Sequence, residues 1–365
     1  MQGSTRRTLP LSALLAGILL GSAAHAQTTI PAGMPEAELY ARAKTESGAL
    51  FVTGIAIPAA KPLGEDFEKK YPGVRLDVIG SIVGLELTQR FELENRNNQH
   101  RISVMTINDY PAMKALVEKG AIAEWRVPTA DRFPKGKIGN SSYSLYYTDV
   151  AVEYNEKLVN EEEAKLLETW EWAANPVFKG RFGVAIQRCS TCYAPLQMML
   201  DPSMEKRYGW AFVEKMASNG GAPYKNTTFL ADRVVAGEKD ISWSVAEGTV
   251  ASLRATGAPV RWKIPSPAPS FPNAWAGISK NAPHPYTARL FMNWLTSEEG
   301  ARALQKHYVV RTSLEGVPDE RAITKEPWYS KNVTYFTIDW DVWAKNEPVV
   351  MPKWDQMITK GAAAR

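Results

Sequence analysis

The 365-residue chain contains few of the residues that hold metals or form disulfides: two cysteines and four histidines. Two cysteines cannot supply most of the stability of so long a chain, so its apolar core must do so. A structural zinc site needs four ligands, and no histidines pair at a metal-site spacing. The sequence therefore predicts no metal site and no cofactor. The histidines are His25, His100, His284 and His307.

The chain also lacks a strong excess of charge of one sign. It carries 43 Lys and Arg against 39 Asp and Glu, a net charge of +4. Removing Arg6 and Arg7 with residues 1–26 leaves 41 basic residues against 39 acidic ones, a net charge of +2. A nucleic-acid-binding surface should appear as a concentrated basic face. Nucleic acid is therefore excluded as the expected partner.

Long apolar runs are missing from the chain after its N-terminal segment. No apolar stretch in that later part approaches the roughly 18 residues of a membrane span. At the N-terminus, Arg6-Arg7 precedes an apolar run over 9–24 and the sequence Ala24-His25-Ala26. A positive start, a short apolar core and an Ala-x-Ala end are the parts of a secretory signal peptide. A twin-arginine signal and a membrane anchor are the alternatives. We expect residues 1–26 to be cleaved and the mature protein to lie in the periplasm.

Motifs of the common enzyme classes are not found either. The segment 80–84 does not fit the Gly-x-Ser-x-Gly elbow of a serine hydrolase. Neither a Gly-x-Gly-x-x-Gly sequence nor a phosphate-loop lysine motif follows a strand. The acids at 161–163 are typical of the first turn of a helix. The sequence predicts no catalytic residue, and we do not expect an enzyme.

Short apolar runs alternate with amphipathic segments from residue 48 onward. Alternation of strands and helices predicts an α/β chain with largely parallel sheets. The expected strands are 49–53, 74–79, 102–107, 182–186, 240–245 and 274–278. The expected helices are 62–71, a segment around 87–94, 111–119, one from about 193, one from 247, and 285–295.

Two segments are expected to cross between domains: the long apolar run 145–154 and the proline-rich segment 265–269. About 110 residues with their own strand and helix units lie between them. This order predicts two lobes joined by more than one strand, with two sequential domains and a proline linker as the alternative. The expected parts are lobe 1 (27–144 and 265–312), lobe 2 (145–264) and a C-terminal tail (313–365) that packs mainly on lobe 2.

The two cysteines form the sequence Cys189-Ser190-Thr191-Cys192. In an oxidising compartment this spacing predicts a small local disulfide. A thioredoxin-type redox site and a pair of free thiols are the alternatives, although the motif lacks the Gly-Pro pair between the cysteines.

The turns that follow the expected strands hold hydroxyls, backbone amides, a few aromatics and one arginine. In open parallel sheets, ligands bind beyond the carboxyl ends of the strands, where helix N-termini present unpaired amides. These turns therefore predict a site for a small polar ligand, with Trp243 and Trp275 as its aromatic wall. The expected ligand-binding residues are Thr53, Ser81, Asp109, Arg188, Ser190, Thr191, Trp243, Glu247 and Trp275.

Six segments lie in order through nearly all of the mature chain, at 41–48, 67–74, 152–155, 175–181, 235–238 and 296–300. Their sequences, order and spacing together resemble periplasmic solute-binding proteins of ABC importers. The group includes ferric-ion, phosphonate and sugar-phosphate binders. The resemblance implies a type II periplasmic-binding-protein fold, with two lobes that are each a mostly parallel sheet flanked by helices. It also implies closure on a ligand and delivery to an ABC permease in the inner membrane, and we expect a monomer.

The resemblance also bears on the ligand. Ferric binders of this group supply consecutive tyrosines near the end of lobe 2, often with a histidine in the first strand–helix loop. The matching stretches here, 242–247 and 53–58, contain neither Tyr nor His. Tyr146-Tyr147 is a tandem pair, but strand alternation sends the two rings to opposite faces. We therefore expect an organic anion such as a carboxylate, phosphonate or sugar phosphate, with ferric iron as the alternative. Asp109 and Glu247 would then contact donor groups of the ligand, such as hydroxyl or ammonium.

Overall fold

The structure is a computed structural model that describes residues 30–55, 57–82, 84–186 and 189–363. The predicted signal peptide, 1–26, lies outside the described residues. The described residues from Pro31 onward form one compact unit. Within the described ranges, no helix combines the length and the apolar character that a membrane crossing requires.

A first group of parallel strands has the order β2-β1-β3, with β1 in the middle. Each of these strands is only four residues long and is followed by a helix, as the alternating pattern predicts. The strands are β1 (Ala49–Val52), β2 (Leu76–Ile79) and β3 (Val104–Ile107). The helices are α2 (Ile57–Lys70), α3 (Gly84–Arg96) and α4 (Tyr110–Glu118).

A second group of parallel strands has the order β8-β6-β7. Its strands also alternate with helices, so both groups are built from strand–helix units. The strands are β6 (Phe182–Ala185), β7 (Ala222–Tyr224) and β8 (Ile241–Ala246). The helices are α6 (Ser190–Met199), α7 (Gly209–Ser218), α8 (Thr227–Val235) and α9 (Glu247–Ala255).

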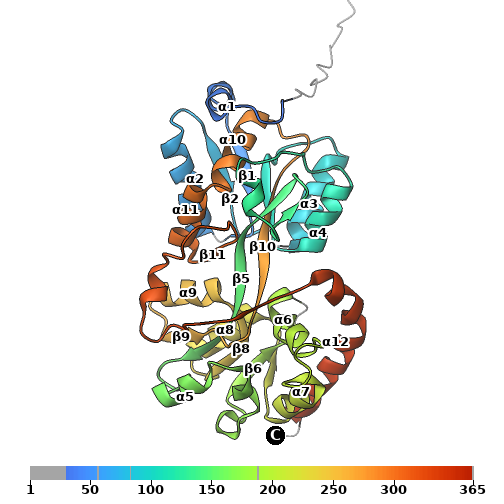
Figure 1. Cartoon of the computed structure of the whole chain (residues 1–365), viewed down its shortest axis with the longest axis vertical. Coiled ribbons are helices and arrows are strands. Elements are labelled where there is room, and N and C mark those ends of the chain that lie inside the picture. Colours follow the sequence, from blue (N-terminus) through green and yellow to red (C-terminus); the bar gives the residue numbers. More distant parts are fainter. Residues whose placement is uncertain (1–29, 56, 83, 187–188, 364–365) are drawn as a thin grey trace, which may run out of the picture. The chain divides into compact units, whose positions relative to one another are not determined.

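Two long strands, β5 (Ser142–Asn155) and β10 (Ala268–Ile278), lie side by side and connect the two groups (Figure 1). β10 pairs antiparallel with β3 and with β5, and β5 pairs antiparallel with β8. The order through the connected sheet is therefore β2-β1-β3-β10-β5-β8-β6-β7. Shorter strands pair at the sides: β4 (Lys137–Ile138), β9 (Val260–Lys263) and β11 (Arg311–Thr312) with β5, and β12 (Tyr335–Thr337) with β10.

The remaining helices cover the sheets. α12 contributes Met351, Trp354 and Ile358 to a core that it shares with α6 and α7. Figure 1 shows α12, in red, beside α7. The helices are α1 (Glu36–Ala43), α5 (Glu161–Leu166), α10 (Pro285–Leu295), α11 (Glu298–Tyr308) and α12 (Trp340–Ala363). Short 3-10 helices lie at Ala130–Arg132, Trp170–Ala174, Pro176–Phe178 and Ala322–Lys325.

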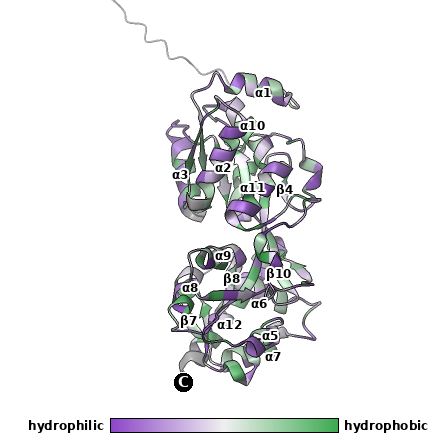
Figure 2. Cartoon of the chain, turned by 90° about the vertical axis from the view of Figure 1, so that its left-hand side faces the viewer, coloured by the Kyte–Doolittle hydropathy of each residue, from purple (hydrophilic) through white to green (hydrophobic). Residues whose placement is uncertain are grey.

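Apolar residues of the strands and of the inner helix faces form the cores. One cluster joins β1, α3, β3 and α4 and includes Trp275 of β10. A larger cluster centres on β6, α6 and Trp243. In Figure 2, α2 presents many hydrophilic residues on its outer side, as an amphipathic helix on a buried sheet should. The predicted α/β class is confirmed, with antiparallel pairing confined to the connecting strands and their short partners.

Several predicted boundaries differ from the structure, most of them by three residues or fewer. The segment 265–269 was expected to be a connector, but β10 begins at Ala268 and contains Pro269 and Pro272. A strand tolerates proline where its ladder does not need that residue's amide. The helix expected over 62–71 begins at Ile57, with Pro62 inside its second turn. The helix expected from about 193 begins at Ser190, because Cys189 acts as its N-cap.

Candidate functional site

The loop after β1 is held by the side chain of Thr53. This side chain is fully buried. Its Oγ1 lies 2.6 Å from Oγ1 of Thr106 on β3 and accepts a hydrogen bond of 3.1 Å from the Ile55 amide. Both bonds are internal to the protein, so Thr53 shapes the loop and presents no free hydroxyl on its surface.

The loop after β2 is joined to the loop after β1. The amide of Ser81 donates to the carbonyl of Ile55 over 2.9 Å, and the amide of Ile82 donates to the carbonyl of Thr53 over 3.2 Å. Ser81 is exposed and has a φ of 63°. Residues other than glycine rarely adopt this left-handed conformation, and such positions are often found at functional sites.

The turn after β3 contributes Asn108 and Asp109. Asp109 is exposed and caps α4 by accepting a hydrogen bond of 2.9 Å from the Ala112 amide. The side chain of Asn108 packs against Gly54, where an added Cβ would lie 3.2 Å from Nδ2. Oδ1 of Asn108 is buried and has no hydrogen-bond partner among the described residues. The glycine therefore allows the loops after β1 and β3 to approach closely.

Trp275 lies on β10 next to the end of β3. In the antiparallel ladder, Trp275 lies opposite Ile107. The centroid of its ring is 5.0 Å from the centroid of the Tyr110 ring. Only 3% of Trp275 is exposed. The structure thus brings Trp275 together with the turn that carries Asp109, although most of the indole packs within the core.

In the second group of strands, the predicted site residues Ser190 and Thr191 form the start of α6. Both side chains are half-buried. The first amides of a helix have no partner within it, so this end favours an anion. The predicted disulfide between Cys189 and Cys192 is confirmed. Arg188 lies outside the described residues.

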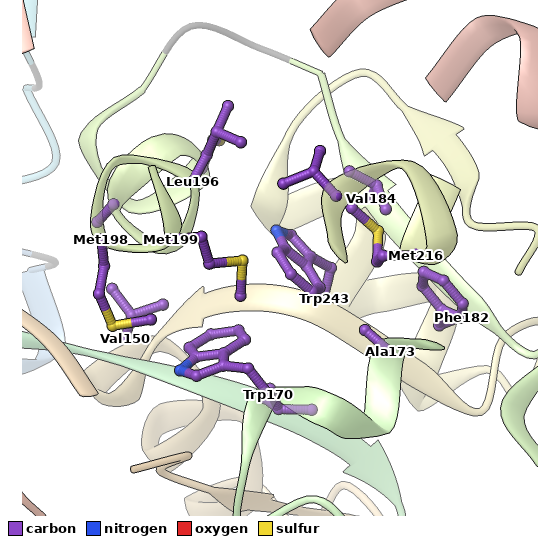
Figure 3. Packing of buried hydrophobic residues seen from close by; sticks show 14 of the residues in the cluster. Val150, Trp170, Ala173, Phe182, Val184, Leu196, Met198, Met199, Met216 and Trp243 are labelled. Atoms are coloured by element: carbon purple, nitrogen blue, oxygen red, sulfur yellow. The ribbon is translucent and has the colours of Figure 1, made fainter. Parts of the chain in front are cut away.

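The structure places Trp243 inside the largest core cluster. Its side chain is fully buried, and its ring centroid lies 5.1 Å from that of Trp170. Figure 3 shows the indole among Trp170, Met199 and Val184. Trp243 was expected to form a ligand wall, but in the described structure it has no exposed surface with which to do so.

Glu247, the first residue of α9, belongs to a buried polar network. Its Oε2 accepts a hydrogen bond of 2.5 Å from Nη1 of Arg321, and its Oε1 accepts one of 2.6 Å from the hydroxyl of Tyr329. The indole Nε1 of Trp262 donates to the same Oε1 over 3.2 Å. Burial raises the pKa of Glu247, whereas the charge of Arg321 opposes that rise. Each oxygen of the carboxyl group therefore has a partner within the chain.

Sequence reasoning did not include Arg321 or Asn108 among the site residues. Arg321 is separated from Glu247 by 74 positions, so no local pattern connects them. Asn108 was part of an expected turn, but its contact with Gly54 depends on the pairing of β1 with β3. Among the described residues, no group of three or more His, Cys, Asp or Glu side chains is arranged to hold a metal ion.

A family model described as bacterial extracellular solute-binding protein matches residues 55–302 of the chain. The match begins in the loop after β1 and continues into α11, so it includes all the predicted site residues except Thr53. No curated protein sequence matches the chain.

Solved structures with the same fold include three with named ligands or conformations. Ferric iron-binding protein A of Mannheimia haemolytica, in an open conformation, has a TM-score of 0.64 and 16% identity over 86% of this chain and 98% of that one. AfuA of Actinobacillus pleuropneumoniae, with fructose-6-phosphate bound, has a TM-score of 0.62 and 18% identity over 86% and 99%.

FutA of Trichodesmium, in complex with iron and citrate, has a TM-score of 0.63 and 19% identity over 85% of this chain and 99% of that one. At such identities the similarity establishes the fold alone. The predicted type II periplasmic-binding-protein fold is confirmed.

Proposed function

Because the chain belongs to the bacterial extracellular solute-binding protein family, we propose that it captures a small organic anion and delivers it to an ABC permease in the inner membrane. The chain is a solute-binding protein of the ABC-transporter type and not an enzyme. The expected resemblance to this family is confirmed. The ligand class, the permease, the monomeric state and the cleaved signal peptide are parts of the proposal.

The observation that carries the ligand class is the start of α6. Two hydroxyl side chains, Ser190 and Thr191, lie in the first turn of a ten-residue helix that follows a parallel strand. The helix dipole attracts negative charge at this end, and the hydroxyls add donors that fit carboxylate, phosphonate or phosphate oxygens. We propose Ser190 and Thr191 as the anion-binding residues, with Arg188 as their expected cationic neighbour.

We propose that the other part of the ligand meets the loops of the first strand group. Ser81 and Asp109 are exposed there, and Trp275 lies against Tyr110 beside Asp109. The free carboxylate oxygen of Asp109 suits a hydroxyl or ammonium group of the ligand. Thr53, Trp243 and Glu247 support the surrounding structure in this proposal, since their polar or aromatic groups are already enclosed by the chain.

Closure on the ligand is proposed to bend β5 and β10. These two strands pair with each other and with strands of both groups. A lobe built from 27–144 and 265–312 would then move against one built from 145–264, with the tail 313–365 following the second lobe. Hinge motion of this kind couples ligand contact to a change that a partner protein can recognise.

Ferric iron, named for several proteins of this fold, is the alternative ligand. The end of β8 offers Trp243, Ala246 and Glu247 in place of consecutive tyrosines. Tyr146 is buried with its ring 5.5 Å from that of Tyr308, and burial raises the pKa of both phenols. A raised pKa disfavours the phenolate form that a ferric ion requires. These observations favour the organic anion over iron.

A thermal-shift panel tests the proposed ligand class. The probes are citrate, fructose 6-phosphate, 2-aminoethylphosphonate, glycine betaine and ferric ion, each added to the purified mature protein. A ligand at 100 times its Kd stabilises the folded state by about 2.7 kcal/mol, which raises the Tm by several degrees. We expect a shift with at least one of the three organic anions. A shift with ferric ion and with none of the organic probes would contradict the proposal.

A further inference from the structure

The two sulfurs of the Cys189–Cys192 bridge lie in different surroundings. Cys192 is 1% exposed and belongs to the core cluster around Trp243. Cys189 is half-buried and only borders that cluster. A thiolate that attacks the bridge in the folded protein can therefore approach the sulfur of Cys189 more easily than that of Cys192.

Cys189 is also the N-cap of α6, and its sulfur points at the helix end. Sγ of Cys189 accepts a hydrogen bond of 3.2 Å from the amide of Cys192. A disulfide sulfur is a weak acceptor, whereas a thiolate is a strong one. A thiolate at a helix N-terminus is stabilised further by the helix dipole. The geometry thus stabilises the reduced form of Cys189 more than the oxidised form.

The bridge contributes little to the stability of the fold. A disulfide stabilises a protein mainly by closing a loop in the unfolded chain, and the effect increases with loop length. Cys189 and Cys192 are three positions apart in sequence. Since the closed loop is so short, the entropic stabilisation from this bridge is among the smallest that a disulfide gives. Stabilisation of the fold therefore does not explain the bridge well.

The first turn of α6 is also missing one helical hydrogen bond. Pro195 lies inside the helix and has no amide hydrogen, so it cannot donate to the carbonyl of Thr191. The amides of Cys192 and Tyr193 both donate to the carbonyl of Cys189, over 3.1 and 3.3 Å. Opening the bridge would therefore loosen Cys189 and the half-buried start of this turn, while Cys192 and Tyr193 stay packed in the core.

We propose that Cys189–Cys192 is a redox-active site that exchanges with a dithiol, through attack at Cys189. A thiolate of the dithiol forms a new bond to Sγ of Cys189 while the bond to Cys192 breaks, and Cys192 leaves as a thiolate that takes up a proton. The second thiol of the dithiol then attacks the mixed disulfide and releases Cys189. The dithiol is oxidised by two electrons to a disulfide, and the bridge is reduced to two thiols.

Dithiothreitol is the probe for the first test. The folded mature protein is equilibrated with mixtures of reduced and oxidised dithiothreitol, trapped with iodoacetamide, and analysed by mass spectrometry of peptides. We expect the bridge to open while circular dichroism and the melting transition still report a folded protein. Brief alkylation should label Cys189 before Cys192. Reduction that occurs only together with unfolding would overturn the proposal.

Two single variants form a matched pair for the second test. In Cys192→Ser, the thiolate absorbance near 240 nm should titrate with a pKa below the roughly 8.5 of a free cysteine. In Cys189→Ser, the remaining Cys192 should resist alkylation in the folded state because it is buried. A Cys189 pKa at or above about 8.5 would overturn the proposal. Neither test uses a transported solute, so failure here leaves the proposed transport function untouched.

Discussion

Nη1 of Arg321 lies 2.5 Å from Oε2 of Glu247, and both side chains are almost completely buried. The pair joins the first residue of α9 to the segment that follows β11. Asp319 and Tyr329 contact the same guanidinium, with Nη2 of Arg321 2.8 Å from Oδ2 of Asp319. A region that sequence reasoning assigned to the ligand is thus used to attach a distant segment of the chain.

Replacing Arg321 with methionine should destabilise the protein strongly. The substitution leaves the carboxyl group of Glu247 buried without its cation, and breaking a buried pair in this way costs about 3–5 kcal/mol. The double variant R321M/E247L should recover part of that loss because no buried charge remains. Urea unfolding of the wild type, the single variant and the double variant measures both effects.

Arg302→Met is the control for the loss of an arginine. Arg302 pairs with Glu298 and Glu320 at the surface, where ion pairs contribute little. Its unfolding curve should stay close to that of the wild type. If R321M unfolds at the same urea concentration as R302M, the ion pair with Glu247 does not stabilise the fold.

Glu153→Gln should make the protein more stable at alkaline pH. Burial, together with the charge of Asp232, raises the pKa of Glu153 well above its usual range. The folded state then keeps a proton that the unfolded state releases above about pH 4.3. Stability therefore falls as the pH rises from there to the folded pKa, by at most about 1.4 kcal/mol per pH unit. The glutamine variant removes this dependence.

Unfolding by urea at several pH values between 4 and 9 checks this prediction. The wild type and Glu153→Gln should differ little at pH 4, and the variant should be the more stable one at pH 8. Glu65→Gln is the control, because Glu65 is exposed and lies 3.9 Å from Lys61. Equal stability of the wild type and E153Q across the range would mean that Glu153 ionises normally in the fold.

Trp243→Ala should reduce stability without a specific effect on solute binding. Removing a fully buried indole leaves a cavity and costs about 3–5 kcal/mol. Trp340→Ala is the comparison, since Trp340 is only partly buried against Phe271, and its loss should be smaller. Binding measured on the folded fraction should be unchanged in both. Weaker binding by a stable Trp243→Phe variant would restore Trp243 as a ligand-wall residue.

Reduction of the bridge should loosen the start of α6 locally. Amides in the first turn, from Ser190 to Tyr193, should exchange their hydrogens faster in the reduced protein, because the bridge restrains a turn interrupted by Pro195. The first turn of α8, which Asn226 caps through the Phe229 amide, is the internal control and should not change. Equal exchange rates in both redox states would show that the bridge does not restrain this turn.

Local sequence patterns predicted those helices whose ends carry the residue types usual at helix ends. α10 was expected over 285–295 and occupies Pro285–Leu295, because proline at its first position and a regular apolar face mark it clearly. The start of α6 was missed by three residues, since cysteine is not a usual N-cap. The fold class followed from repetition of such units along the chain.

The candidate site was harder to predict because it depends on tertiary contacts. Trp243 lies in a segment with the pattern of a strand, β8, which is buried on both faces. The sequence of such a strand does not show which side chains line a ligand site and which fill the core. Glu247 was correctly placed at the start of a helix, yet its partner Arg321 comes from a distant segment. Ser190 and Thr191 stay predictions for the ligand contacts.

Isothermal titration with the stabilising anion from the thermal-shift panel tests the central claim most directly. Thr191→Ala removes one proposed donor at the start of α6, and Thr359→Ala removes a helical threonine whose hydroxyl donates only to the Asp355 carbonyl. We predict one binding site in the wild type. T191A should bind at least about tenfold more weakly, because it loses a charge-assisted hydrogen bond. The Kd of T359A should be unchanged. Equal affinity of T191A and the wild type would contradict the anion site at α6.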